Sequence, residues 1–140
     1  MKTKLLLLPL FLLLFSCEVQ GDLTQDVIQE TPIPKDISTL KYSGSFMPTS
    51  GINVNGQVKI YLDNNQYKLE LQNFSISSGP DLKVYLSKSN TPTDFVNLGN
   101  LNSSTVYSIP QNIDIKDYKF VLIHCQQYSH LFAVAELVKN

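Results

Sequence analysis

Residues 57–72 read QVKIYLDNNQYKLELQ, and this stretch sets the fold. Apolar side chains occupy every second position on both sides of the central Asp-Asn-Asn: Val58, Ile60, Leu62, Tyr67, Leu69 and Leu71. A period of two is typical of a strand with one buried face, and Asp and Asn favour tight turns. The stretch therefore predicts an antiparallel hairpin that turns at Asp63-Asn64-Asn65.

Short strand-like runs continue outward from this hairpin in both directions. They fall at 42–47, 82–86, 95–98, 106–109, 118–125 and 132–138. Gly79-Pro80-Asp81 predicts a turn before the run at 82–86, because proline fixes φ and aspartate bonds its own backbone. With no sustained helical period and no internal repeat after residue 40, we expect an all-β chain. It forms a single antiparallel domain over residues 40–140, sandwich-like or barrel-like, with about seven to eight strands.

The N-terminus has the features of an export signal. Lys2 and Lys4 precede an uncharged run at 5–15 that is almost all Leu and Phe. Eleven apolar residues are too few for a transmembrane helix, which needs about 20, but they suit a signal peptide. Leu14-Phe15-Ser16-Cys17 resembles a lipoprotein cleavage site, although Phe15 is larger than the usual residue. We expect residues 1–16 to be a lipoprotein signal peptide and Cys17 to carry the lipid; the alternative is an ordinary secretory signal with an incidental Cys17.

Residues 17–39 differ from the rest in being polar and acidic, with a Thr-Pro-Ile-Pro run at 31–34. They predict a flexible tether, which at some 20 residues spans very roughly 25 Å on average. A first edge strand at 23–28 is the alternative. Together with the lipid on Cys17, the tether predicts a domain anchored to a membrane of the bacterial cell envelope. We expect the outer membrane, with the domain on its periplasmic or surface face.

The composition is that of one folded domain. Removing 16 of the 140 residues leaves 124, enough for a core. Hydrophobic residues are 43% and charged residues 16%, so the chain is not of the disordered class. A net charge of −1, with scattered Lys and Arg, gives no basis for a nucleic-acid partner.

The last third of the chain carries a family resemblance. The segments that carry it are 78–86 (SGPDLKVYL), 98–101 (LGNL), 107–110 (YSIP), 118–125 (YKFVLIHC) and 132–137 (FAVAEL). Over residues 41–137 the chain resembles the DM-thirteen domain, which is named as an electron-transfer module and found in Skeletor-type proteins and beside DOMON and b-type cytochrome domains. The resemblance implies a β-rich extracytoplasmic domain with Gly79, Pro80 and Asp81 in one motif and a characteristic cysteine at Cys125. Two positions depart from the family: His124 stands where Trp is common, and Ala133 stands where Gly is usual.

Cys125 has two interpretations. With lipid on Cys17, Cys125 is a free thiol in an oxidising compartment, where unpaired thiols are a liability. Strand alternation places Cys125 on one face with Val121 and Ile123, which favours a small, inert buried residue. The resemblance implies instead that the thiol, or a group bound there, passes electrons to a redox partner in the envelope. A Cys17–Cys125 disulfide would exclude both the lipid and the free thiol.

A metal or haem site would have to use His124, His130 or Cys125. Cys125 and His130 have the Cys-x4-His spacing of cupredoxins, but blue copper needs two imidazoles, and the chain has only two histidines. His124 neighbours Cys125 and points to the opposite face, and Val134 stands where an axial Met would fall. We expect no copper centre and leave haem ligation through these residues open, with no attachment motif to support it.

No acid, base and nucleophile set suggests an enzyme acting alone. We expect Asp81 to serve turn geometry. Two functions therefore remain: a lipid-anchored redox module that uses Cys125, and a non-redox binding or scaffold lipoprotein in which Cys125 only packs.

Overall fold

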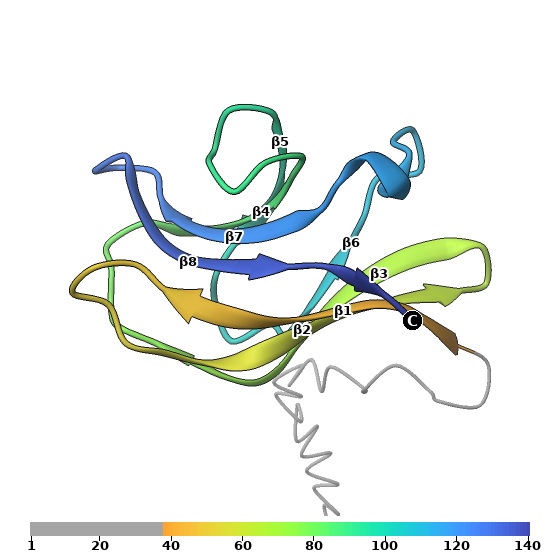
Figure 1. Ribbon diagram of the computed structural model, residues 1–140, viewed down its shortest axis with the longest axis horizontal. Coiled ribbons are helices and arrows are strands. Elements are labelled where there is room, and N and C mark those ends of the chain that lie inside the picture. Colours follow the sequence, from red (N-terminus) through yellow and green to blue (C-terminus); the bar gives the residue numbers. More distant parts are fainter. Residues whose placement is uncertain (1–37) are drawn as a thin grey trace, which may run out of the picture.

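The computed structural model of the chain describes residues 38–140, which form an antiparallel β-barrel that is nearly closed (Figure 1). The signal peptide, Cys17, most of the tether and the alternative strand at 23–28 lie outside the described residues. The strands are β1 (Ser38–Pro48), β2 (Val54–Asp63), β3 (Gln66–Ile76), β4 (Leu82–Ser87), β5 (Phe95–Asn100), β6 (Val106–Ser108), β7 (Phe120–Cys125), β8 (His130–Glu136) and β9 (Val138–Lys139). A 3₁₀ turn, η1 (Ile115–Asp117), precedes β7. The all-β prediction is confirmed, and β1 begins at Ser38, slightly before the expected boundary at residue 40.

The strands are hydrogen-bonded in the order β5-β4-β7-β8-β1-β2-β3-β6, with β9 paired to β1. Figure 1 shows β4, β5 and β7 on one side of the barrel and β1, β2 and β3 on the other. The first and last strands of this order, β5 and β6, come together without a ladder between them. Here the Tyr107 hydroxyl lies 3.0 Å from the Asn100 carbonyl oxygen and 3.2 Å from that of Ser104. A side chain thus links the two edges of the barrel.

The hairpin expected at residues 57–72 is β2 and β3. Its two turn residues, Asn64 and Asn65, have φ of 47° and 65°, as a type I′ turn requires. The inward side chains Val58, Ile60, Leu69 and Leu71 are at most 3% exposed. The predicted pattern and turn are both confirmed.

Strand β1 belongs to both sides of the barrel. Its first part pairs with β2, and Phe46 to Pro48 pair with β8. Gly44 lies where the partner changes, and a Cβ there would overlap the carbonyl oxygen of Glu136. Because only glycine allows this approach, Gly44 lets one strand join the two sides.

The barrel interior is one apolar cluster. Beyond the hairpin residues it contains Val84, Leu86, Val121, Ile123, Cys125, Ala133 and Ala135, each fully buried. Among residues 38–140, no helix is both long and apolar enough to cross a membrane.

The two outer surfaces of the barrel differ in chemistry. The charged face, formed by outward side chains of β2 and β3, includes Lys59, Lys68, Glu70 and Gln72, with Lys59 opposite Glu70. The apolar face lies outside β1, β4, β5, β7 and β8, and consists of Met47, Tyr85, Phe95, Leu122 and Val134. The register across it runs Met47, Val134, Leu122, Tyr85. Leu122 and Tyr85 are 0% and 2% exposed although neither belongs to the interior cluster, so this face has a packed layer of its own.

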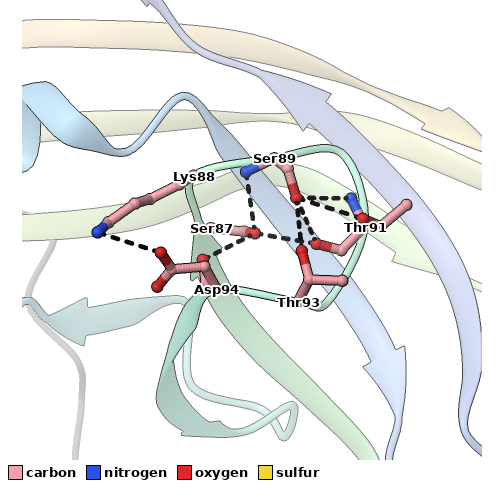
Figure 2. Close-up of polar contacts among 6 residues, drawn as sticks. All are labelled: Ser87, Lys88, Ser89, Thr91, Thr93 and Asp94. Atoms are coloured by element: carbon pink, nitrogen blue, oxygen red, sulfur yellow. Dashed lines mark hydrogen bonds and ion pairs between the residues drawn. The ribbon is translucent and has the colours of Figure 1, made fainter.

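Polar contacts fix the shape of the loop between β4 and β5, which leads into Phe95 (Figure 2). The fully buried Ser87 hydroxyl lies 3.2 Å from the Thr91 carbonyl oxygen and 3.3 Å from that of Asp94. The Lys88 ammonium pairs with the Asp94 carboxylate at 3.2 Å. Phe95 follows directly, and its ring stacks on Tyr85 with centroids 4.0 Å apart. The polar loop therefore positions an aromatic lid over Tyr85.

Candidate functional site

Cys125 is the last residue of β7 and its side chain is 0% exposed. Its sulfur packs in the interior cluster with Val121 and Ile123, as strand alternation predicts. It is the one cysteine among residues 38–140 and forms no disulfide there. The thiol therefore lies in the core and does not open to a cleft.

Three of the segments that carry the family resemblance, 78–86, 98–101 and 118–125, meet at this end of the barrel. Leu82 is the cross-strand partner of Cys125, and the Gln126 amide donates to the Asp81 carbonyl at 3.0 Å. The Leu101 amide donates to the Leu82 carbonyl at 2.8 Å. Pro80 and Asp81 form the expected turn before β4. Main-chain hydrogen bonds thus join the Gly-Pro-Asp turn, the end of β5 and the Cys125 strand.

The residues next to Cys125 at this end of the barrel pack against one another. We call Gly79, Leu82 and Phe132 the end cover. A Cβ on Gly79 would lie 2.8 Å from Leu82 Cδ2 and 3.0 Å from Phe132 Cζ, so the turn packs directly on both side chains. Phe132 belongs to the Cys125 cluster, and Leu82 packs against it. Reaching the sulfur from this end requires the cover to move.

A hollow of about 310 Å³ lies outside the end cover. It is lined by Gly79, Pro80, Asp81, Leu82, Asn100, Leu101 and Asn102. The Lys83 ammonium binds the Asp81 carboxylate at 2.8 Å and donates to the Asn100 side-chain oxygen. The charge of Asp81 is therefore matched within its own turn, which agrees with a role in turn geometry.

His124 points away from Cys125 into the apolar face, where it is 8% exposed. Its ring centroid lies 5.3 Å from that of Tyr85, so Phe95, Tyr85 and His124 form a stack of three rings. The buried Nδ1 has no hydrogen-bond partner. Burial, and then the nearby His130, lower the pKa of His124 below its usual 6.5, which favours a neutral imidazole.

The structure does not bring Cys125, His124 and His130 together into one site. His130 is the cross-strand partner of Cys125, but it is exposed and its ring packs against Phe132 at 5.3 Å. His124 lies on the other face of the sheet. Within the described part of the chain, no group of three or more His, Cys, Asp and Glu side chains is placed to hold a metal ion.

Haem does not fit the residues of the hollow. Axial ligands to haem iron are His, Cys, Met or Tyr, and the lining contains none of them. Cys125 faces the apolar interior beneath the cover. This hollow therefore supplies no axial ligand for haem iron.

Sequence reasoning missed the three-ring stack. Alternation along β7 places Leu122 and His124 on the outer side of the barrel. From the pattern of one strand alone, residues on that side are expected to be exposed to solvent. A signal was present in the run from Phe120 to Ile123, which is apolar on both faces. Such a run is typical of a strand covered on both sides.

The match to known proteins covers most of the described domain. The family model named electron transfer DM13 matches residues 47–137, which is more than half of the chain. Neither the comparison with curated proteins nor that with solved structures gave a match. The matched range includes the Gly-Pro-Asp turn, both histidines and Cys125. The chain therefore belongs to the electron transfer DM13 family.

Proposed function

We propose that this chain is a lipid-anchored electron-transfer module of the bacterial cell envelope and that Cys125 is its redox residue. The observation that supports the proposal is the position of Cys125 beneath the end cover. Three of the segments that carry the family resemblance, 78–86, 98–101 and 118–125, are joined there by main-chain hydrogen bonds. A lone thiol at that point is the one redox-active sulfur that the family match contains.

The chemistry that fits a single thiol is exchange with a disulfide of an envelope partner. The Cys125 thiol loses its proton to solvent, and its sulfur attacks one sulfur of the partner disulfide. That S–S bond breaks, and the second partner sulfur leaves as a thiolate. One thiolate of a dithiol partner then attacks the other sulfur of this mixed disulfide, and Cys125 leaves as a thiolate and takes up a proton. The second thiolate of the dithiol partner attacks the resulting disulfide at the dithiol partner's own sulfur, and the first partner's sulfur leaves as a thiolate, so the dithiol becomes a disulfide and the original disulfide becomes a dithiol. Two electrons have passed between the two partners, and the end cover must open for each exchange.

The second candidate function is a non-redox binding or scaffold lipoprotein. It is favoured by the 0% exposure of Cys125 within an apolar cluster, since a sulfur used only for packing needs no route to solvent. In that case Cys125→Ser lowers stability by about 1 to 3 kcal/mol, as core changes do, and alters no electron transfer.

The deciding experiment is disulfide exchange under native conditions. The full chain with Cys17→Ser is incubated with a small-molecule disulfide, and mixed-disulfide formation is followed by intact mass, before and after a dithiol reductant. The variant that also carries Cys125→Ser is the matched control. We expect a reversible adduct that depends on Cys125 and forms without denaturant. A thiol that reacts only in denaturant, together with a featureless visible spectrum after expression with haem and copper, would refute the redox role.

The anchor is proposed from the sequence before residue 18 and is tested separately. After expression of the full gene in a bacterium, we expect loss of residues 1–16, a diacylglyceryl adduct on Cys17 and recovery with the membranes. Cys17→Ala should abolish both the adduct and the membrane fraction. A Cys17–Cys125 disulfide in place of the lipid would overturn the anchor and the free thiol together.

A further inference from the structure

His124 is the residue that ties the end of β7 to the apolar face. Its imidazole stacks on Tyr85 with an interplanar angle of 27°, and Tyr85 is itself stacked on Phe95 at 13°. On the opposite face, the next residue along the chain is Cys125. A movement of the His124 backbone would therefore act directly on the neighbouring residue Cys125.

The surroundings of His124 accept a neutral ring and provide no partner for a charged one. On β4, the described residues that face it are Lys83, directly across the strands, and Tyr85. On β8 its cross-strand partner is Leu131, and His130 is near enough for its charge to act on His124. The carboxylate on the adjoining turn, Asp81, is bound to Lys83. A protonated His124 would thus place a charged, unpaired Nδ1–H in a buried site beside another cation, which costs free energy.

The pairing of β7 is locally weak at this point. The β7–β8 register shifts between Ile123 and His124, and the turn that follows, residues 126–129, is exposed throughout. Ser129 closes that turn with a positive φ of 49°, an uncommon conformation for serine. Opening the short segment from His124 to His130 would break the pairing of His124 and Cys125 with both β4 and β8, and would leave the rest of β7 paired.

We propose that His124 is a proton-sensitive positioning residue for Cys125. While its imidazole is neutral, the three-ring stack holds the end of β7 closed and Cys125 buried. When His124 takes up a proton it leaves the stack, the β7–β8 turn opens, and the Cys125 sulfur becomes accessible. The use of this opening for electron transfer rests on the proposed function, whereas the opening itself does not.

The test measures exposure of Cys125 against pH. The full chain with Cys17→Ser is treated with 4,4′-dithiodipyridine between pH 7.5 and 5, and each rate is divided by that of a small free thiol at the same pH. The normalised rate should rise as the pH falls below about 6.5, by up to about tenfold per pH unit until the folded-state pKa of His124 is reached. His124→Phe keeps a ring for the stack and cannot take up a proton, so its normalised rate should not change with pH. His130→Gln should follow the parent chain.

A pH-independent normalised rate in the parent chain would overturn the inference, as would an equal rise in His124→Phe. If His124→Phe does not fold, hydrogen exchange of the Cys125 amide in the parent chain gives the same information, because protection that does not fall between pH 7 and 5.5 would also overturn it. A pH-independent thiol that still exchanges with disulfides would leave the redox proposal standing. A pH-dependent thiol that forms no reversible disulfide would refute only the redox proposal.

Discussion

The charged face and the apolar face of this barrel are built on the same alternating pattern but have different surroundings. On β2 and β3, the side chains that point away from the interior include the cross-strand partners Lys59 and Glu70, which are of opposite charge and partly exposed. On β4 and β7, the corresponding residues Tyr85 and Leu122 are almost wholly buried beneath neighbouring rings. The comparison shows that a side chain can point outward from the barrel and still be buried.

The largest effect is expected when a side chain of the packed layer on the apolar face is shortened. Leu122→Ala should lower the free energy of unfolding by about 3 kcal/mol, because it removes a fully buried side chain and leaves a cavity. Lys59→Ala, the matched change on the charged face, should alter it by less than about 0.5 kcal/mol. Urea unfolding measures both. Equal effects would mean that the apolar face has no packed layer.

The lid of that layer is the next test. Phe95→Ala should cost about 2 kcal/mol, since it removes the ring stacked at 4.0 Å on Tyr85 and exposes that side chain. Phe95→Leu should recover part of the loss. Tyr128→Ala, at a tyrosine that is 68% exposed in the β7–β8 turn, is the control and should leave the unfolding midpoint unchanged. A Phe95→Ala chain as stable as this control would show that Phe95 does not cover Tyr85.

The burial of His124 in the apolar face should make the stability of the chain depend on pH. Burial lowers the folded-state pKa of His124 below its unfolded value of about 6.5, so the unfolded chain binds more protons. The contribution of neutral His124 is complete above pH 6.5 and is lost as the pH falls through the folded-state pKa. Between pH 6.5 and 5.5 the loss is up to about 1 kcal/mol. Urea unfolding at both pH values should show this loss in the parent chain and a smaller one in His124→Phe; the same loss in both chains would assign it to other groups.

The smallest effect concerns an ion pair beside the β2–β3 turn. Lys68→Met removes the ammonium that lies 2.7 Å from Asp63, whose side chain is only 9% exposed, so we expect a loss of about 1 kcal/mol that shrinks in high salt. Lys88→Met at the exposed Lys88–Asp94 pair is the control and should cause no measurable change. A salt-independent loss for Lys68→Met would point to packing of its aliphatic stem.

Local sequence predicted the barrel strands well because their patterns are local. The β2–β3 hairpin follows from alternation around Asn64-Asn65, and the inward position of Cys125 follows from its spacing to Ile123. Three features could not be predicted this way, since each depends on residues far apart in the chain. They are the change of partner at Gly44, the link from Tyr107 to Asn100 and the stack of Phe95 on Tyr85. The missing partner of His124 Nδ1 likewise appears only when its neighbours are in place.

The pairing of β1 with β8 and β9 sets the order in which this barrel can be completed. Phe46 pairs with Ala135, and the Asn140 amide donates to the Lys41 carbonyl at 2.9 Å. The pairing of β1 is therefore complete only after the last strands have formed. Until then β1 can pair only with β2 and presents its other edge unprotected. Contacts so distant in sequence make folding slow. The N-terminal hairpins alone therefore cannot close the barrel, which is complete only once β8 and β9 have paired with β1.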